Sequence, residues 1–306
     1  MTITKPGIYD IPAEQYHADP VEVPSLSCSI AKKLVFQSPL HAHYHHPRLG
    51  GQGGGAPSAA MRDGTVLHAL LLGKGGDVVP VYADDFRTKA AQVARDEALA
   101  AGKTPILARK LDEMQDAVKI IRGRIEEHED ARLLFQPGKA EQVMVWQEGE
   151  TWFRSMVDWK LDDLRLPLVD LKGTGLSAAP EDWQRRVVEE YAFQDAFYAR
   201  GFKALHGITP PPMLFIVIEF DAPHGVSVLS PDLSLRKIAS SQVERAVQTW
   251  KHCMSARSWP GYMPKTFHVA APVWAIRNHE EREIMAEIAA THAAAGNIVH
   301  AHQGVA

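Results

Sequence analysis

The chain has 306 residues, of which 45% are hydrophobic and 23% are charged. This balance is typical of a globular protein and excludes a largely disordered chain, and the length allows one large domain or two small ones. The formal net charge of -4 means that any contact with nucleic acid must use a local basic surface or a bound metal ion.

The cysteine count and the apolar runs exclude further classes of protein. Two cysteines, Cys28 and Cys253, are too few for a four-thiolate zinc or iron–sulfur site. The longest strongly apolar run, Met213 to Ile218, is too short to cross a membrane, and the N-terminus lacks the apolar core of a signal peptide. A soluble protein of the cytoplasm, without a membrane partner, is therefore expected.

Before residue 58 the sequence predicts a short helix that runs through Ile30, Lys33 and Leu34. Residues 1–48 are rich in Pro, His and Ser, and the glycine-rich segment 50–55 lacks the Gly-Lys-Ser/Thr ending of a phosphate-binding loop. Apolar residues at helical spacing then predict a helix from Ser58 to Leu72 and a longer one from Ile106 to Glu127. We interpret the longer helix as a solvated amphipathic insertion before the strands.

After Pro137 the pattern changes to short extended segments. Residues 141–147, 152–160 and 166–172, joined by tight turns, predict three strands of an antiparallel meander. The elements predicted after them are a helix over 180–200, a buried strand over 213–220, an extended segment over 226–229, a helix over 235–257 and a frayed tail past Thr291.

Three ionisable residues stand out on the predicted strands. Asp170 and Lys172 point to the same face of the third strand because side chains alternate, and a hairpin would place Asp158 beside Asp170. Two carboxylates buried together repel each other and require a cation, for which a hard divalent ion such as Mg²⁺ suits the oxygen ligands. Lys172 would then position the attacking water or stabilise charge on the phosphate under attack. The alternative for the Asp-x-Lys triplet alone is a surface ion pair.

The helix predicted after the strands carries a second polar group. Tyr191, Gln194 and Tyr198 share one face because their spacings are three and four residues. Gln194 could bond a phosphate or a catalytic group, and Tyr198 could stack on or bond to DNA. The alternative for the tyrosines is packing in a half-buried core.

These motifs, taken in order, resemble those of a nuclease superfamily. The stretch Val169-Asp170-Leu171-Lys172-Gly173-Thr174 resembles the core motif of PD-(D/E)xK nucleases, and more specifically of their RecB-like branch, in which Thr often stands at the place of Gly173. Gln194 and Tyr198 resemble the Gln-x-x-x-Tyr motif of that branch, and residues 64–68 resemble its Gly-x-x-x-His motif.

The resemblance implies a fold and a set of site residues. The fold is α/β of the α+β type, with a central mixed sheet flanked by helices in the order αβββαβ and with elaborations at both ends. The catalytic residues implied are Asp158, Asp170, Lys172, Gln194 and Tyr198. The implied ligands of Mg²⁺, for which Mn²⁺ substitutes, are His68, Asp158, Asp170, the main-chain carbonyl of Leu171 and Glu141. The alternatives are a core position for His68 and a ligand-orienting role for Glu141.

Segments near both ends narrow the resemblance to RecE-type exonucleases (the exonuclease VIII group) of phages and prophages. The segments are Pro6 to Tyr9, Pro24 to Ser29, Ser38-Pro39, Trp259 to Tyr262 and Pro272 to Trp274, and with them the resemblance spans residues 6–276. We therefore expect an N-terminal extension with a glycine-rich loop over 1–57, a nuclease domain over 58–276, and a C-terminal helix with a flexible tail over 277–306.

The RecE-type resemblance implies an ATP-independent 5′-3′ exonuclease that degrades linear double-stranded DNA by the attack of a metal-activated water on the phosphodiester. It also implies phage or prophage recombination in the cytoplasm of a bacterial host, a ring-shaped homo-oligomer, and a single-strand annealing protein as partner. The alternatives are a structure-specific or single-strand endonuclease, and a non-catalytic module with a nuclease-like fold that binds DNA ends or proteins.

Overall fold

The computed structural model describes residues 2–52, 59–74 and 77–302, so that part of the glycine-rich segment lies outside the described residues. The elements in chain order are β1 (Gly7–Tyr9), α1 (Ala13–His17), β2 (Leu26–Ser27), α2 (Cys28–Phe36), α3 (Pro39–His45), α4 (Ala59–Leu72), β3 (Val78–Val81), α5 (Lys89–Ala100), β4 (Thr104–Leu107), α6 (Ala108–Glu127), η1 (Ala131–Phe135), β5 (Gly138–Glu148), β6 (Thr151–Leu161), β7 (Val169–Thr174), α7 (Pro180–Arg186), η2 (Val187–Tyr191), α8 (Ala192–His206), β8 (Leu214–Glu219), β9 (Val226–Leu229), α9 (Leu233–Ala256) and α10 (Val273–His302).

The main sheet has mixed strand directions. Its order is β1-β5-β6-β7-β8-β9, and β2 pairs in parallel with β6. The neighbours β5–β6, β6–β7 and β8–β9 are antiparallel, whereas β7 and β8 are parallel and are joined through α7 and α8. The central mixed sheet flanked by helices agrees with the fold class expected from the sequence.

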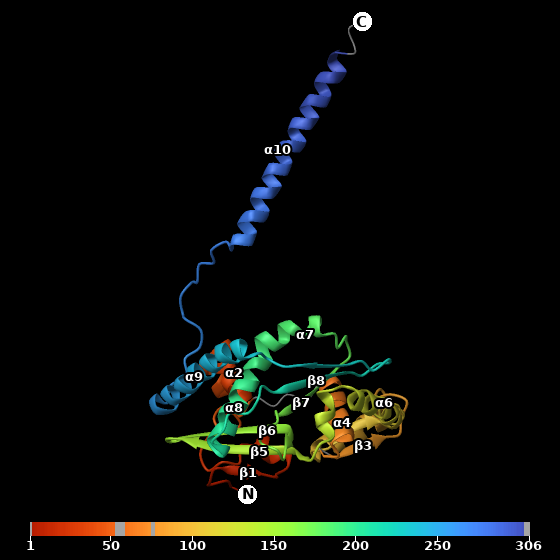
Figure 1. Ribbon diagram of the computed structural model, residues 1–306, viewed down its shortest axis with the longest axis vertical. Coiled ribbons are helices and arrows are strands. Elements are labelled where there is room, and N and C mark those ends of the chain that lie inside the picture. Colours follow the sequence, from red (N-terminus) through yellow and green to blue (C-terminus); the bar gives the residue numbers. More distant parts are fainter. Residues whose placement is uncertain (1, 53–58, 75–76, 303–306) are drawn as a thin grey trace. The chain divides into compact units, whose positions relative to one another are not determined.

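Helices cover the sheet from two sides, as Figure 1 shows for α2, α8 and α9 on one side of β7 and β8 and for α4 and α6 on the other. The first side holds the larger core, with fully buried Trp146, Phe153, Phe197 and Trp250 among its members. The second side holds a smaller core in which α4 and α6 pack against β7 and β8. Val169 and Leu171 of β7 belong to the smaller core, and the alternating side chains of Asp170 and Lys172 point to the opposite face of the strand.

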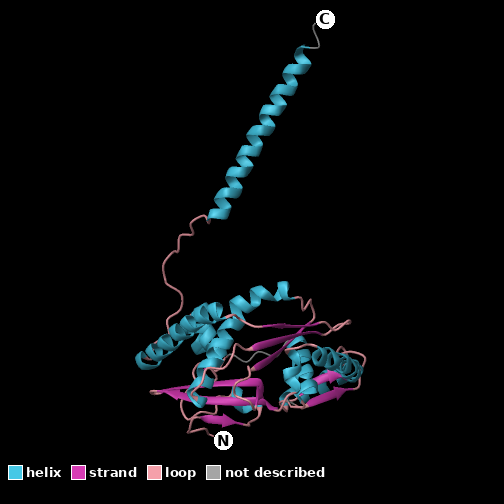
Figure 2. Ribbon diagram, in the orientation of Figure 1, coloured by secondary structure: helices cyan, strands magenta, loops and turns pink. Residues whose placement is uncertain are grey.

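The segment between α4 and β5 forms a small α/β insertion rather than a helix alone. The sequence predicted a helix that begins at Ile106, but residues Thr104–Leu107 form β4, which pairs in parallel with β3. Figure 2 shows this two-stranded sheet beside α4 and α6, apart from the main sheet. The helix α6 is amphipathic, as predicted, and buries Val118, Ile121 and Ile125 in the smaller core.

The helix predicted over 180–200 is divided in the structure. It consists of α7, a π-helical turn η2 (Val187–Tyr191), and α8, which continues to His206. A π-helical turn widens the helix by one residue and is frequently found at functional sites. Here it ends at Tyr191, three residues before Gln194.

The chain divides into two compact units, residues 1–261 and 262–306. The first holds both sheets and their flanking helices. The second consists of an extended stretch and α10, which continues to His302 although the sequence predicted a frayed tail past Thr291. The domain boundaries predicted after residues 57 and 276 stay predictions. None of the helices in the described part of the chain is long and apolar enough to cross a membrane.

Candidate active site

The strands β6 and β7 separate at the place where the predicted acidic residues lie. Their register contains a single pair, Trp159 with Val169. Continued by one residue, this register would set Asp158 opposite Asp170. The ladder ends there, and the backbone N–H of Leu171 instead donates to Asp158 Oδ2 at 2.8 Å. A carboxylate therefore fills the gap that the missing ladder bonds leave between the two strands.

Asp170 is buried in this gap, with only 3% of its surface exposed. Its Oδ1 accepts a hydrogen bond from Gln194 Nε2 at 2.5 Å, and its Oδ2 contacts the ammonium group of Lys172. Burial alone would lower the pKa of Lys172, but the charges of Asp170 and Asp158 raise it above its ordinary value. Lys172 is therefore a permanent cation beside two carboxylates.

The pair of carboxylates carries more negative charge than Lys172 balances. Burial and the charge of Asp170 raise the pKa of Asp158 to about 6, although His68 and Lys172 oppose the shift. The Asp158 side chain is mostly buried, with 15% of its surface exposed. A carboxylate with a raised pKa beside a second one gains most from a cation.

His68 reaches the same gap from α4. Neighbouring Leu67 is buried in the smaller core and holds α4 against the sheet. His68 Nε2 lies 3.0 Å from the Leu171 carbonyl oxygen and 3.7 Å from Asp158 Oδ2. The structure therefore brings His68 and Leu171 together with the acidic pair, as the resemblance implied.

The donor atoms in the gap fit a hard divalent cation. They are the carboxylates of Asp158 and Asp170, the Leu171 carbonyl and the His68 imidazole, a set dominated by oxygen. Among the residues that the structure describes, no three His, Cys, Asp or Glu side chains are already grouped around one point as a metal site. Asp170 instead faces Lys172, whose ammonium supplies positive charge there.

Glu141 occupies a different environment. It lies on β5 between the register pairs Ala140–Trp159 and Gln142–Val157, which places it at a bulge across from Asp158. Its φ of 49° is left-handed, and its side chain lines a separate cavity with Asp10 and Lys74. The structure thus sets the Glu141 backbone beside the site without placing its carboxylate with the other predicted ligands.

The two tyrosines of α8 and η2 have different roles in the packing. The Tyr198 hydroxyl donates to the Met156 carbonyl of β6 at 2.9 Å, and burial raises the pKa of Tyr198 well above its ordinary value. Tyr198, which the sequence predicted as catalytic, therefore braces β6 from the larger core. Tyr191 lies closer to the acidic pair, because Lys172 Nζ is 5.0 Å from the centre of its ring.

The helix α2 also borders the site, which the sequence did not predict. Burial raises the pKa of the Cys28 thiol to about 11, with the charges of Lys32 and Lys172 opposing the shift and that of Asp170 adding to it. The first turn of α2 therefore lies within reach of these charges. No sequence motif links α2 to β7. The two elements lie far apart in the chain, and spacing patterns connect only residues that are close in sequence.

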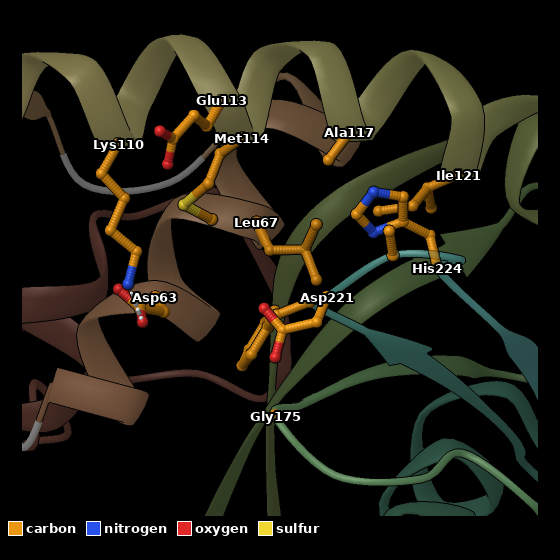
Figure 3. Close-up of a pocket in the computed structure, with 12 residues that line it drawn as sticks. Asp63, Leu67, Lys110, Glu113, Met114, Ala117, Ile121, Gly175, Asp221 and His224 are labelled. Carbon is orange, nitrogen blue, oxygen red and sulfur yellow. Dashed lines mark hydrogen bonds and ion pairs between the residues drawn. The ribbon is translucent and has the colours of Figure 1, made fainter.

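A cavity of about 530 Å³ lies on the other side of β7, between α4, α6 and the turn after β8 (Figure 3). Leu67 and Phe220 line it, and its polar wall includes Asp221 and the ion pair between Asp63 and Lys110. This acidic wall does not suit a phosphate backbone. The carboxylates of the β6–β7 gap do not line the cavity.

Phe220 also explains the glycine at position 173. A Cβ atom on Gly173 would lie 2.4 Å from the Phe220 ring and 3.3 Å from Leu67. The ring therefore takes the space that a threonine side chain would need. Gly173, next to Lys172, therefore stands in place of the threonine of the RecB-like branch because the Phe220 ring fills the space beside it.

Comparisons with known proteins agree with this fold. A family model described as a PDDEXK-like domain of unknown function (DUF3799) matches residues 29–266. The crystal structure of a candidate exonuclease from Eubacterium rectale is similar to the chain, with a TM-score of 0.54 and 12% sequence identity over 88% of this chain and 98% of that one. At this identity the likeness concerns the fold alone. No curated protein matches the chain by sequence.

Proposed function

The chain belongs to the family of PDDEXK-like domains of unknown function (DUF3799), and from that premise we propose that it is a divalent-metal-dependent DNA exonuclease. The observation that carries the proposal is the β6–β7 gap, where Asp158 and Asp170 face a single compensating cation, Lys172. A closed structural cluster would balance its charges, whereas this one carries more negative charge than Lys172 balances, which supports the binding of a further cation.

The residues of the gap have separable tasks in hydrolysis. Asp158, Asp170, the Leu171 carbonyl and His68 would hold the divalent ion, for which we propose Mg²⁺ or Mn²⁺. When bound, such an ion lowers the pKa of water and neutralises charge on a phosphate. Gln194 fixes the orientation of Asp170 through its 2.5 Å hydrogen bond. Lys172 places a permanent positive charge where the phosphate gains negative charge during the attack of water.

Two observations support an exonuclease rather than another nuclease. The segments near both ends resemble RecE-type exonucleases, and the similar structure from Eubacterium rectale is itself named as a candidate exonuclease. On this basis we propose that linear double-stranded DNA is degraded from 5′ ends, in phage or prophage recombination inside a bacterial cell. A ring-shaped homo-oligomer and a single-strand annealing partner belong to the same proposal.

One assay tests the activity and its class. Purified protein is incubated with linear and with covalently closed circular duplex DNA, each with Mg²⁺ and with EDTA, and end-labelled substrates then give the polarity. We expect degradation of the linear DNA only, with Mg²⁺ only. Lys172→Ala should lower the rate by about a hundredfold or more, because one charge-stabilising group is lost at the phosphate.

The matched control is Lys119→Ala, which removes an exposed lysine of α6 and should leave the rate unchanged. Cutting of closed circles would overturn the exonuclease in favour of an endonuclease. Binding of DNA without cleavage by any divalent metal would overturn the enzyme in favour of a binding module. Circular dichroism on Lys172→Ala checks that the lost activity does not reflect lost folding.

A further inference from the structure

A row of three aromatic rings lies beside the acidic pair. Tyr191, the last residue of the π-helical turn, stacks on Trp183 of α7 with ring centres 5.9 Å apart and on Phe215 of β8 with ring centres 5.1 Å apart. Trp183, Tyr191 and Phe215 are 4%, 9% and 0% exposed. Rings this deeply buried cannot stack on nucleobases, so the row serves as an apolar support for the groups around it.

Three cations from three separate elements lie against this row. Lys172 Nζ is 5.0 Å from the centre of the Tyr191 ring, and Lys32 Nζ of α2 is 5.8 Å from the same centre. The guanidinium of Arg186 is 4.9 Å from the centre of the Trp183 ring. Burial raises the pKa of Tyr191, and the positive charges of Lys172 and Arg186 oppose this shift. A cation over an aromatic face is held in place without being neutralised.

Among the residues that the structure describes, two of these cations have no acidic partner. Within the described part of the chain, Lys172 pairs with Asp170, whereas no carboxylate forms an ion pair with Lys32 or Arg186. The neighbouring Arg185 differs, because Glu189 binds it at 2.8 Å. Lys32 and Arg186 are thus positive charges fixed by aromatic contacts and available to an anion from outside.

From this arrangement we infer that Lys32 and Arg186 bind phosphate groups of the substrate DNA strand adjacent to the phosphate at the Asp158–Asp170 pair. The inference rests on the proposed function for the identity of the strand. The chain carries a net charge of -4, so contact with a polyanion needs a local basic surface. The cations beside the aromatic row supply such a basic surface, and Lys172 is one of them. Both residues position the strand and take no part in bond breaking.

The two residues also come from elements that the fold holds firmly. Helix α2 is capped by Ser27, whose Oγ accepts from the Ile30 N–H, and packs against α9. Arg186 ends α7, and its position relative to Gln194 depends on the π-helical turn between them. The turn therefore places Trp183, Tyr191 and Gln194, which donates to Asp170, on one continuous helical segment.

The test is the salt dependence of DNA binding by the full chain. Fluorescence anisotropy measures Kd for a labelled linear duplex over a range of KCl concentrations, with Ca²⁺ replacing Mg²⁺. Lys32→Ala and Arg186→Ala should each weaken binding about tenfold at low salt and reduce the slope of log Kd against log [KCl] by about 0.7 to 0.9. Lys32→Arg keeps the charge and should keep the slope.

Matched controls separate a phosphate contact from a general loss of charge. Lys33→Ala removes the next lysine of α2, and Arg185→Ala removes the arginine that Glu189 already binds; both should keep the wild-type slope. With Mg²⁺, Lys32→Ala and Arg186→Ala should raise KM more than they lower kcat, because a positioning residue acts on binding.

The outcomes distinguish this inference from the function on which it rests. Cleavage by the wild type together with unchanged slopes in Lys32→Ala and Arg186→Ala would overturn the inference alone. Equal slope changes in the variants and the two controls would overturn it as well. Absence of cleavage with reduced slopes in the two variants would overturn the nuclease and support the phosphate contacts. Absence of DNA binding by the wild type would overturn both.

Discussion

Two clusters of buried charged residues each include one residue of strand β6, and the charges of the two clusters are balanced in different ways. The closed cluster (Asp19, Ser25, His46 and Arg154) joins the N-terminal segment to the sheet: Arg154 Nη1 lies 3.1 Å from Asp19 Oδ1 and donates to the Ser25 carbonyl at 2.6 Å. Asp19 also accepts from the Ser25 N–H at 2.9 Å and the Ser25 hydroxyl at 2.6 Å. Every charge there has a partner from the chain itself.

The open cluster (His68, Asp158, Asp170 and Lys172) lies further along the same strand. It holds two carboxylates for one permanent cation, and the pKa of Asp158 is raised to about 6 by burial and by Asp170. A buried ion pair costs desolvation that only well-placed partners offset. The comparison teaches that completeness of pairing, rather than burial of charge, separates a structural cluster from a candidate binding site.

Removal of Arg154 should break the closed cluster and produce the largest effect on stability. Arg154→Met leaves Asp19 buried without its cation, so the free energy of unfolding should fall by about 3–5 kcal/mol in urea titrations. Arg165→Met is the control, because the pair of Arg165 with Asp163 is solvent-exposed and should contribute little to the free energy of unfolding. Equal losses in the two variants would contradict the closed cluster as a structural unit.

Acid should weaken the closed cluster through His46. Its Nδ1 accepts from the Arg48 N–H at 3.2 Å and its Nε2 lies 3.1 Å from the Ser25 carbonyl, which suits a neutral ring. Burial, with the charge of Arg154, lowers the pKa of His46 to about 4. The unfolded chain takes up this proton near pH 6.5, so the free energy of unfolding should fall by about 3 kcal/mol as pH drops from 6.5 to 4.

Urea titrations of the wild type and of His46→Gln at pH 7 and pH 4.5 isolate this contribution. The variant has no imidazole to protonate, so its loss of stability between the two pH values should be smaller. An identical pH dependence in both proteins would assign the acid sensitivity to other groups.

In the open cluster, removal of a charge should have the opposite sign. Asp158→Asn keeps an oxygen that accepts from the Leu171 N–H but removes the repulsion with Asp170. Because the folded pKa of about 6 exceeds the unfolded value, the ionised acid destabilises the folded chain above pH 6. In EDTA at pH 8, Asp158→Asn should therefore raise the free energy of unfolding by about 1–2 kcal/mol.

Thermal melts with and without Mg²⁺ complete this comparison. Mg²⁺ should raise the Tm of the wild type by mass action and leave that of Asp158→Asn unchanged, because the variant lacks a ligand. Asp162→Asn, at an exposed turn, is the control and should behave as the wild type does. A fall in stability of Asp158→Asn in EDTA would show that the acidic pair is already balanced.

The contrast also shows which features the sequence could predict. The three strands from β5 to β7 and the order of β8, β9 and α9 follow from patterns of period two and from turn residues between them. Asp158, Asp170 and Lys172 come together because they lie near one hairpin. Local alternation and short loops fix such features, so they can be inferred without the fold.

Features that depend on distant parts of the chain were not predictable. Lys32 meets Tyr191 only because α2 packs beside α8, and Arg154 meets Asp19 only because the N-terminal segment folds over β6. The division of one predicted helix at η2 leaves no trace in its apolar spacing. Glu141 matches an expected acidic position, but the left-handed backbone at the bulge turns its side chain into another cavity.

The single register pair between β6 and β7 has a consequence for hydrogen exchange. Most amides of β5 and β6 are bonded within the sheet and exchange with deuterium only when large parts of it open. The Leu171 amide is bonded instead to one carboxylate at the edge of the gap. Its exchange rate follows the position of that side chain, so a single backbone proton reports on whether Asp158 faces the chain or a bound ion.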